Sequence, residues 1–404
     1  MVRRSNRAPS EAFLTLVFDL IQAVRLDSPA MRHSREPRIG SAPGRGRRLA
    51  WALACGTITA SLLPAHGTAQ QMPASLRQFL QQAISLDQDQ LAAATRGEPV
   101  VKTLETSDRR EVVVFGLVRI DVPRFFYVRE VADFAASLRA PWRRHFAIFS
   151  DPAQAADVAA LALPHADVQD LAHCRPGSCN LKLSAGDIAA LRARLDSGAA
   201  RADSMASAYF RARFLDYVTG YRARGDSALI VYDDEQAATA AAQVFDAILS
   251  RSPFLYQYAP SLERYLKHYP QYRPGEVTEG LFWSEDDLAT IKPILTITHQ
   301  VVYAPPELQG VTLIAAKQLY ADHYFDGGLD VTAVVDQAGT ETALPAGIYV
   351  VLLRRLHFDE LPSAGPINIR GKVRGKLRDQ TTTLLRDMKA ESERAYASPP
   401  GPSR

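Results

Sequence analysis

The side chains best suited to hold a small molecule lie in the carboxy-terminal third of the chain. They are His299, Lys317, Tyr320, His323 and Tyr324, all within predicted strands. Alternate side chains of a strand share a face, and this spacing places His299 among apolar neighbours. Ligand sites are usually apolar pockets with a few convergent polar groups. We therefore predict a ligand cavity lined by His299, His323 and one of the tyrosines, with Lys317 nearby.

Two other interpretations fit the same residues. His299 also fits a hydrogen-bonded histidine of the core, beside a strand from Lys317 to Asp326 that has one solvated face. General acid–base catalysis by His323 with Asp322 or Asp326 is the other interpretation, because a positioned imidazole can transfer protons near neutral pH.

The chain lacks the short motifs of the large enzyme classes. It contains no GxSxG, HExxH or P-loop motif, and no GxGxxG in a strand–turn–helix context. The acidic run Glu285, Asp286 and Asp287 is expected to begin a helix rather than to bind a metal. We assign no catalytic residue, no metal site and no cofactor, and a hydrolase without a recognisable motif is an alternative.

Two cysteines flank a predicted turn. Cys174 and Cys179 enclose Pro176 and Gly177, which favour a tight turn that can bring the two thiols within bonding range. In an oxidising compartment we expect a disulfide. A metal site of His173 with the two thiolates is the alternative, although it lacks a clear fourth ligand.

A secretory signal is predicted near the amino terminus. The basic residues Arg45, Arg47 and Arg48 precede an apolar run over 49–63, and small residues follow, so we place cleavage after Ala69. The mature protein would then be periplasmic or extracellular. A retained membrane anchor is the alternative, and Met31 competes with Met1 as the true start.

The charge balance indicates no polyanionic partner. The formal net charge of the 404 residues is +3, so we expect no nucleic acid partner. A cluster of basic residues opens the last predicted helix: Arg370, Lys372, Arg374, Lys376 and Arg378. We interpret this cluster as a solvated helix face, or else as a contact with anionic lipid headgroups.

Hydrophobic periodicity predicts an α+β protein. Runs rich in β-branched and aromatic residues predict strands over 111–121, 294–303, 311–325, 329–335 and 348–358. Short turns, one of them at Asp326, Gly327 and Gly328, favour an antiparallel meander. A single amphipathic helix is expected over 75–94, and a long helix begins at Ile369.

These elements divide the chain into consecutive segments. We expect an extension and signal at 1–69, a helix and linker at 70–110, and the first part of a sheet domain at 111–183. A mainly helical insertion with many tyrosines follows at 184–279. The meander and the carboxy-terminal helix occupy 280–394, and 395–404 form a disordered tail.

A sheet meander closed by a long carboxy-terminal helix resembles the helix-grip fold of START-like and Bet v 1-like proteins. The phrases 174–183 and 317–326 are also similar to uncharacterised secreted bacterial proteins. The helix-grip resemblance implies a non-catalytic protein that binds an apolar or amphipathic small molecule, such as a lipid, between sheet and helix. A cell-envelope protein that uses its insertion to bind other proteins is the alternative.

Overall fold

A computed structural model describes residues 72–138, 143–196, 201–287, 292–337, 347–359 and 369–398. The predicted signal, its cleavage point after Ala69 and the start at Met31 lie outside these residues. No helix of the described part is long and apolar enough to cross a membrane.

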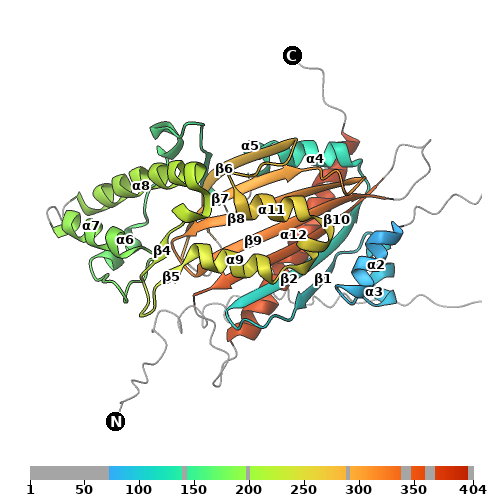
Figure 1. Cartoon of the computed structure of the whole chain (residues 1–404), viewed down its shortest axis with the longest axis horizontal. Coiled ribbons are helices and arrows are strands. Elements are labelled where there is room, and N and C mark those ends of the chain that lie inside the picture. Colours follow the sequence, from blue (N-terminus) through green and yellow to red (C-terminus); the bar gives the residue numbers. More distant parts are fainter. Residues whose placement is uncertain are drawn as a thin grey trace, which may run out of the picture. The chain divides into compact units, whose positions relative to one another are not determined.

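One antiparallel sheet of eight strands organises the chain (Figure 1). Its strand order is β1-β2-β10-β9-β8-β7-β6-β3, so every strand from β6 to β10 pairs with the next in sequence. The strands are β1 (Val100–Leu104), β2 (Glu111–Ile120), β3 (Arg143–Ile148), β6 (Val277–Asp286), β7 (Ile294–Tyr303), β8 (Val311–Ala321), β9 (Phe325–Asp336) and β10 (Ile348–Phe358).

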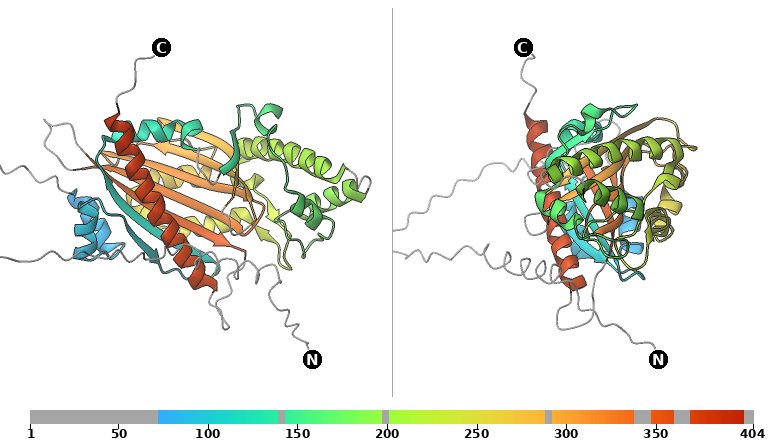
Figure 2. Two further views of the ribbon diagram at one scale, coloured as in Figure 1. Left: turned by 180° about the vertical axis from the view of Figure 1, so that it is seen from behind. Right: turned by 90° about the vertical axis from the view of Figure 1, so that its left-hand side faces the viewer.

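One face of the sheet carries the long helix α12 (Ile369–Ala397), which crosses β1 and β2 (Figure 2). The crossing is close: a Cβ added at Gly116 would lie 2.9 Å from Leu385 and 3.1 Å from Thr381. The short helices α4 (Arg124–Ala132) and α5 (Phe134–Ser137) pack on the same face. The α+β architecture with an antiparallel sheet and a long last helix, predicted from the sequence, is confirmed.

The opposite face of the sheet is covered by helices from two parts of the chain. At one end lie α2 (Ala74–Gln82) and α3 (Gln88–Thr95), which bury Leu80 and Leu91 against Phe115 and Tyr349. Helices inserted between β3 and β6 cover the rest of this face (Figure 1). They bury the Trp283 side chain completely.

The inserted segment contains most of the helices. Its elements are a 3-10 helix (Ala155–Val158), α6 (His165–Leu171), α7 (Ala185–Asp196), α8 (Ala202–Arg224), a second 3-10 helix (Gly225–Ala228), β4 (Val231–Tyr232), β5 (Thr239–Ala240), α9 (Ala241–Ser250), α10 (Pro253–Tyr258) and α11 (Pro260–His268). These elements start soon after β3, so the inserted segment is longer than the expected 184–279.

The turn between β8 and β9 differs from the expectation. The sequence placed it at Asp326, Gly327 and Gly328, but the chain turns four residues earlier, over 322–324, where Tyr324 takes a left-handed φ of +64°. The two glycines lie inside β9, where neighbouring side chains crowd the backbone. A Cβ at Gly327 would meet Val244 at 3.2 Å, and one at Gly328 would meet Leu356 at 3.0 Å.

Two helix predictions are also wrong. The single helix expected over 75–94 is broken into α2 and α3 at Ser85, whose φ is +58°. Glu285 and Asp286 do not begin a helix but end strand β6. They pair there with β3, and Asp286 makes an ion pair of 2.6 Å with Arg143.

The basic cluster at the start of α12 is divided between the sheet and solvent. Arg374 makes an ion pair of 2.7 Å with Glu105, and Arg370 donates to the main-chain oxygen of Glu111 at 3.4 Å. Lys376 and Arg378 are exposed. The cluster is therefore not one solvated face.

Candidate functional site

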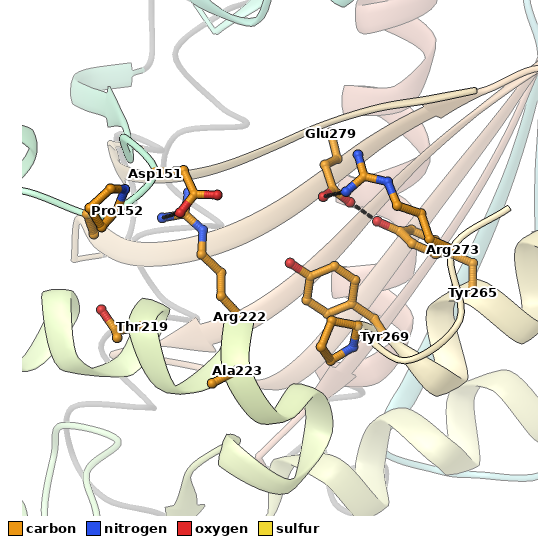
Figure 3. Close-up of a pocket in the computed structure, with 11 residues that line it drawn as sticks. Asp151, Pro152, Thr219, Arg222, Ala223, Tyr265, Tyr269, Arg273 and Glu279 are labelled. Carbon is orange, nitrogen blue, oxygen red and sulfur yellow. Dashed lines mark hydrogen bonds and ion pairs between the residues drawn. The ribbon is translucent and has the colours of Figure 1, made fainter. Parts of the chain in front are cut away.

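A pocket of about 420 Å³ opens where the insertion meets the sheet (Figure 3). Its wall comes from α8, from α11 and the chain that follows it to the start of β6, and from the segment after β3. The lining side chains that carry charges or rings are Asp151, Arg222, Tyr265, Tyr269, Arg273 and Glu279. Three stretches of the chain, within 151–153, 219–223 and 265–279, thus supply one site.

A glycine brings the two helical walls together. Gly225 ends α8 with φ +58° and ψ −138°, a conformation that glycine adopts far more readily than other residues. A Cβ at this position would lie 1.8 Å from the main-chain oxygen of Tyr269. The missing side chain allows the end of α8 to contact the chain after α11, and this contact positions Tyr269.

Stacked rings form the back of the pocket. The Tyr269 ring lies nearly parallel to the buried Tyr221 ring, with centroids 5.0 Å apart, and its centroid is 4.7 Å from that of His299. Tyr265 packs edge-on against Tyr269 at 5.7 Å. Tyr269 is only partly buried, so its ring remains accessible from the pocket while its position is held from behind.

The charged groups of the pocket are paired in opposite signs. Glu279 accepts a hydrogen bond from the Tyr265 hydroxyl and makes an ion pair of 2.9 Å with Arg273. Arg222 lies 3.7 Å from Asp151 and donates to the main-chain oxygen of Phe149. The site therefore offers both guanidinium donors and carboxylate acceptors, without a large excess of either charge.

His299 connects Glu279 to the buried rings. Its Nε2 lies 3.4 Å from the Glu279 carboxylate and its Nδ1 lies 3.1 Å from the Tyr221 hydroxyl. A carboxylate only accepts, so Nε2 carries the proton and Nδ1 accepts from Tyr221. Burial lowers the pKa of His299, despite the opposing effect of Glu279, and favours the neutral ring.

Lys317 lies beside His299 in the register of β7 and β8. Its ammonium group pairs with Asp226 and lies 3.5 Å from the centroid of the Phe245 ring. Burial lowers the pKa of Lys317 to about 8, although Asp226 acts in the opposite direction. Lys317 is fully buried behind the rings, so it supports the site without lining the pocket.

The site has no activated nucleophile among its described residues. Tyr221 is fully buried, and desolvation raises the pKa of its hydroxyl well above the usual value. That hydroxyl donates to a neutral histidine which does not face the pocket. The geometry is suited to holding a molecule by stacking and hydrogen bonding.

Tyr320 belongs to an apolar cluster of the insertion. A bulge in β8, where Leu319 is the extra residue, turns Tyr320 toward the insertion, and its ring packs at 5.5 Å from Phe214. Its hydroxyl donates to the main-chain oxygen of Lys182 at 3.2 Å. Tyr320 therefore does not line the pocket.

His323 and Tyr324 form part of a second group at the end of β8. His323 lies 3.3 Å from Asp167 of α6 and next to Asp322. The Tyr324 hydroxyl accepts a hydrogen bond from the Lys292 main chain at 3.2 Å. The structure thus brings Lys317 to His299 but places His323 and Tyr324 at a separate site.

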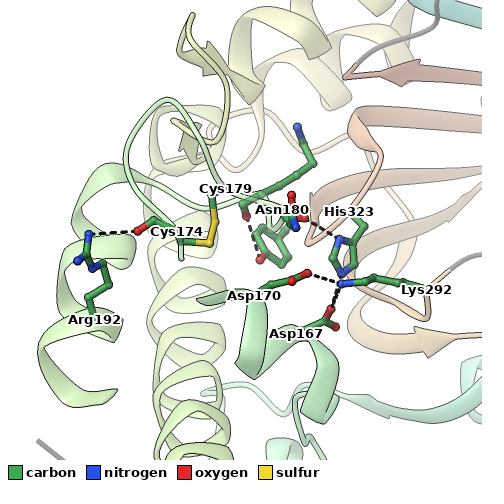
Figure 4. The surroundings of a disulfide bond; sticks show 10 residues. Asp167, Asp170, Cys174, Cys179, Asn180, Arg192, Lys292 and His323 are labelled. Atoms are coloured by element: carbon green, nitrogen blue, oxygen red, sulfur yellow. Dashed lines mark hydrogen bonds and ion pairs between the residues drawn. A yellow bond between two sulfur atoms is a disulfide. The ribbon is translucent and has the colours of Figure 1, made fainter. Parts of the chain in front are cut away.

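Cys174 and Cys179 form a disulfide, as the sequence predicts (Figure 4). Their Cα atoms are 4.3 Å apart, and Arg175 and Ser178 pair across the turn. The bond uses both thiols, so the alternative metal site with His173 is wrong. The disulfide lies in the same part of the insertion as Asp167 and Asp170 of the second group.

The face of the sheet beside α12 is not apolar at its centre. Asp330 and Arg354 form a bidentate ion pair there, with contacts of 2.7 to 3.0 Å. Thr298, Gln300 and Gln318 share this face and are partly exposed. A lining of this kind does not suit a purely apolar ligand.

Sequence reasoning missed most of the pocket. Glu279 was placed at the end of the helical insertion, and Arg222 and Arg273 had no distinguishing signal. The one usable signal is the many tyrosines of the insertion, which are densest over 254–272. That stretch supplies Tyr265 and Tyr269.

Comparisons with known proteins give little beyond the fold. No protein-family model matches the chain, and no curated protein matches it. Among solved structures, a START superfamily protein from Mycobacterium smegmatis is similar over 38% of this chain and 90% of its own, at 16% identity and a TM-score of 0.21.

Proposed function

We propose that this protein is an exported, non-catalytic binding protein for a small amphipathic molecule, which it holds in the pocket between α8 and the chain after α11. The observation that carries the proposal is the Tyr269 ring, stacked on Tyr221 and open to a pocket of about 420 Å³. Ligand pockets commonly have volumes of about 300 to 1,000 Å³.

The lining indicates which chemistry the ligand has. A planar or apolar part would pack on the Tyr269 ring, since aromatic pairs gain about 0.5 to 1.5 kcal/mol beyond their buried area. A polar end would reach Arg222, Arg273 and Glu279, which supply donors and an acceptor. This mixture favours an amphipathic molecule over a wholly apolar lipid.

This proposal places the ligand on the face of the sheet opposite the one implied by the helix-grip resemblance. Where α12 crosses β2, Thr381 and Leu385 pack closely over Gly116 and leave no room for a ligand. The pocket lies on the other face, where the insertion covers the sheet.

Export is supported by two features. The chain carries the basic and apolar pattern of a secretory signal before Ala69, and its two remaining cysteines are joined. Structural disulfides persist mainly in oxidising compartments. Amino-terminal sequencing of the protein from its own host should begin at Gln70, and cell fractionation should find it outside the cytosol. An intact amino terminus on a cytosolic protein would contradict export.

The binding site is tested with the amphipathic probe 1-anilinonaphthalene-8-sulfonate, which combines fused rings with one sulfonate. Tyr269→Ala should weaken its binding about tenfold, which corresponds to about 1.4 kcal/mol. Tyr256→Ala is the matched control, because Tyr256 is exposed on α10 and is not part of the pocket. Unchanged affinity in a folded Tyr269→Ala variant would rule out this pocket, and native mass spectrometry of protein from its host would identify the natural ligand.

A further inference from the structure

Three buried side chains converge where α6 meets the end of β8. Asp167 comes from α6, and Asp322 and His323 come from the turn after β8. Each is at most 3% exposed. One ligand atom from each residue lies within 4.8 Å of the others. Figure 4 shows Asp167 and His323 directed toward each other.

The orientation of His323 is set by a main-chain carbonyl. Its Nδ1 lies 3.0 Å from the oxygen of Asn180, and because a carbonyl only accepts, Nδ1 carries a proton. Nε2 lies 3.3 Å from a carboxylate oxygen of Asp167, but this contact lacks the geometry of a hydrogen bond. Metal-binding histidines usually donate their other ring N–H to a carbonyl or a carboxylate in this way.

In both carboxylates one oxygen accepts a hydrogen bond and the other does not. One oxygen of Asp322 accepts from the Leu295 main chain at 2.9 Å, and one oxygen of Asp167 accepts from Lys292 at 2.7 Å. The second oxygen of each carboxylate is buried and finds no hydrogen-bond partner in the described part of the chain. A buried polar atom without a partner costs about 1 to 3 kcal/mol, and three such atoms belong to this one group.

The cation already present does not account for this arrangement. Lys292 contacts Asp167 and also Asp170, at 2.5 Å, so its single charge is shared by two carboxylates of α6. Among the described residues, no hydrogen bond or ion pair joins Lys292 to Asp322. A divalent ion would take one ligand atom from each of the three residues and would balance the second carboxylate.

We propose that Asp167, Asp322 and His323 form a structural site for a divalent transition metal ion, with Zn²⁺ as the best match. Zinc takes imidazole nitrogen and carboxylate oxygen at about 2.0 to 2.2 Å, usually with four ligands in a tetrahedron. The three ligand atoms lie within 4.8 Å of one another, so they would move closer together to bind one ion, and a water molecule would complete the set. Because the residues are buried, the ion supports structure: it ties α6 of the insertion to the sheet.

The test uses tag-free, full-length mature protein that has been stripped with a chelator and titrated with Zn²⁺ alone. The wild type should bind one equivalent and unfold at a higher temperature with the ion present. Asp322→Asn, which preserves shape, should weaken Zn²⁺ binding by more than about tenfold, the least effect expected even for outer-shell partners. Asp170→Asn is the matched control: it removes an α6 carboxylate outside the site and should bind Zn²⁺ close to the wild-type level.

Two results would overturn the proposal: no Zn²⁺ binding by the wild type, or equal binding by wild type and Asp322→Asn. If Asp322→Asn does not fold, X-ray absorption of the zinc-loaded wild type decides. One imidazole with oxygen ligands supports the site. A sulfur ligand, or oxygen ligands without imidazole, places the ion elsewhere and refutes it. The outcome is independent of the pocket at Tyr269, whose variants do not touch these residues.

Discussion

The main-chain oxygen of Tyr269 lies 1.8 Å from the position that a Cβ of residue 225 would occupy, so only glycine fits at the end of α8. This contact joins two walls of the pocket and fixes the ring on which we propose the ligand stacks.

Gly225→Ala should therefore damage both stability and binding. The backbone at Gly225 has a positive φ, which costs other residues about 1 to 3 kcal/mol, and the added methyl would push the Tyr269 segment away. We expect a lower unfolding temperature and weaker probe binding. Gly375→Ala is the control, since nothing lies within 4 Å of a Cβ there, and it should be neutral or slightly stabilising. Equal melting temperatures for the wild type and Gly225→Ala would contradict the close contact.

Lys317 predicts a pH dependence of stability. Its pKa is about 8 in the folded protein and about 10.5 when unfolded, so between these values the unfolded chain holds a proton that the folded protein lacks. Stability rises with pH wherever the unfolded state binds more protons. Relative to Lys317→Met, the wild type should gain stability as pH rises from about 8 to 10.5, by up to about 3 kcal/mol.

Urea unfolding of both proteins at pH 7, 8, 9 and 10 measures the difference between their free energies of unfolding. Groups that titrate alike in the two proteins do not contribute to this difference. Below pH 8 the difference should be flat. A difference that does not change with pH would show that Lys317 keeps its ordinary pKa in the folded state, and one that falls as pH rises would show that its pKa is raised.

We expect that removing the charge of Lys182 lowers the stability of the protein more than removing any other cation would. Its buried ammonium group lies 2.8 Å from Asp326, 3.2 Å from Asp234 and 3.9 Å from Asp359. Removing one partner of a buried ion pair costs about 3 to 5 kcal/mol, because the other charge is left uncompensated. Lys182→Met should therefore be strongly destabilised in thermal unfolding. Lys376→Met on exposed α12 is the control and should be close to the wild type, and equal stabilities would refute the role of Lys182.

The disulfide should contribute modestly to stability. Closing the short loop between Cys174 and Cys179 is worth about 2 kcal/mol on a chain-entropy estimate. The double substitution Cys174→Ser with Cys179→Ser should lower stability by about that amount. A reducing agent should destabilise the wild type and leave the double variant unchanged. If the reducing agent destabilised both proteins equally, its effect would not come from the Cys174–Cys179 disulfide.

The strands that could be predicted are those whose local sequence matches their surroundings. β7 and β10 are dense in β-branched residues, and their observed bounds are those expected. The turn after β8 was misplaced because an Asp-Gly-Gly sequence is a strong local signal for a turn. Here the two glycines lie within β9 instead, where Val244 and Leu356 leave little room for a side chain. β6 was missed altogether, and its acidic end was expected to begin a helix; ion pairs with β3 outweigh the local preference there.

The sites could be predicted only in part. His299 and Lys317 share a face through strand register, which alternation in the sequence can indicate. Tyr269 and Glu279 reach His299 through the path of the insertion, and no local pattern specifies that path. His323 was identified as a candidate residue, but its partner Asp167 is more than 150 positions earlier and carries no motif.

The insertion leaves and rejoins the sheet at adjacent antiparallel strands: Phe149, just after β3, donates to the main-chain oxygen of Leu281 in β6 at 2.8 Å. A short hairpin could therefore replace the whole insertion without altering the order of the strands. A protein shortened in this way would expose Trp283, Leu295 and Ile297 to water. The insertion is therefore needed to keep this face of the sheet out of water, although the order of the strands does not require it.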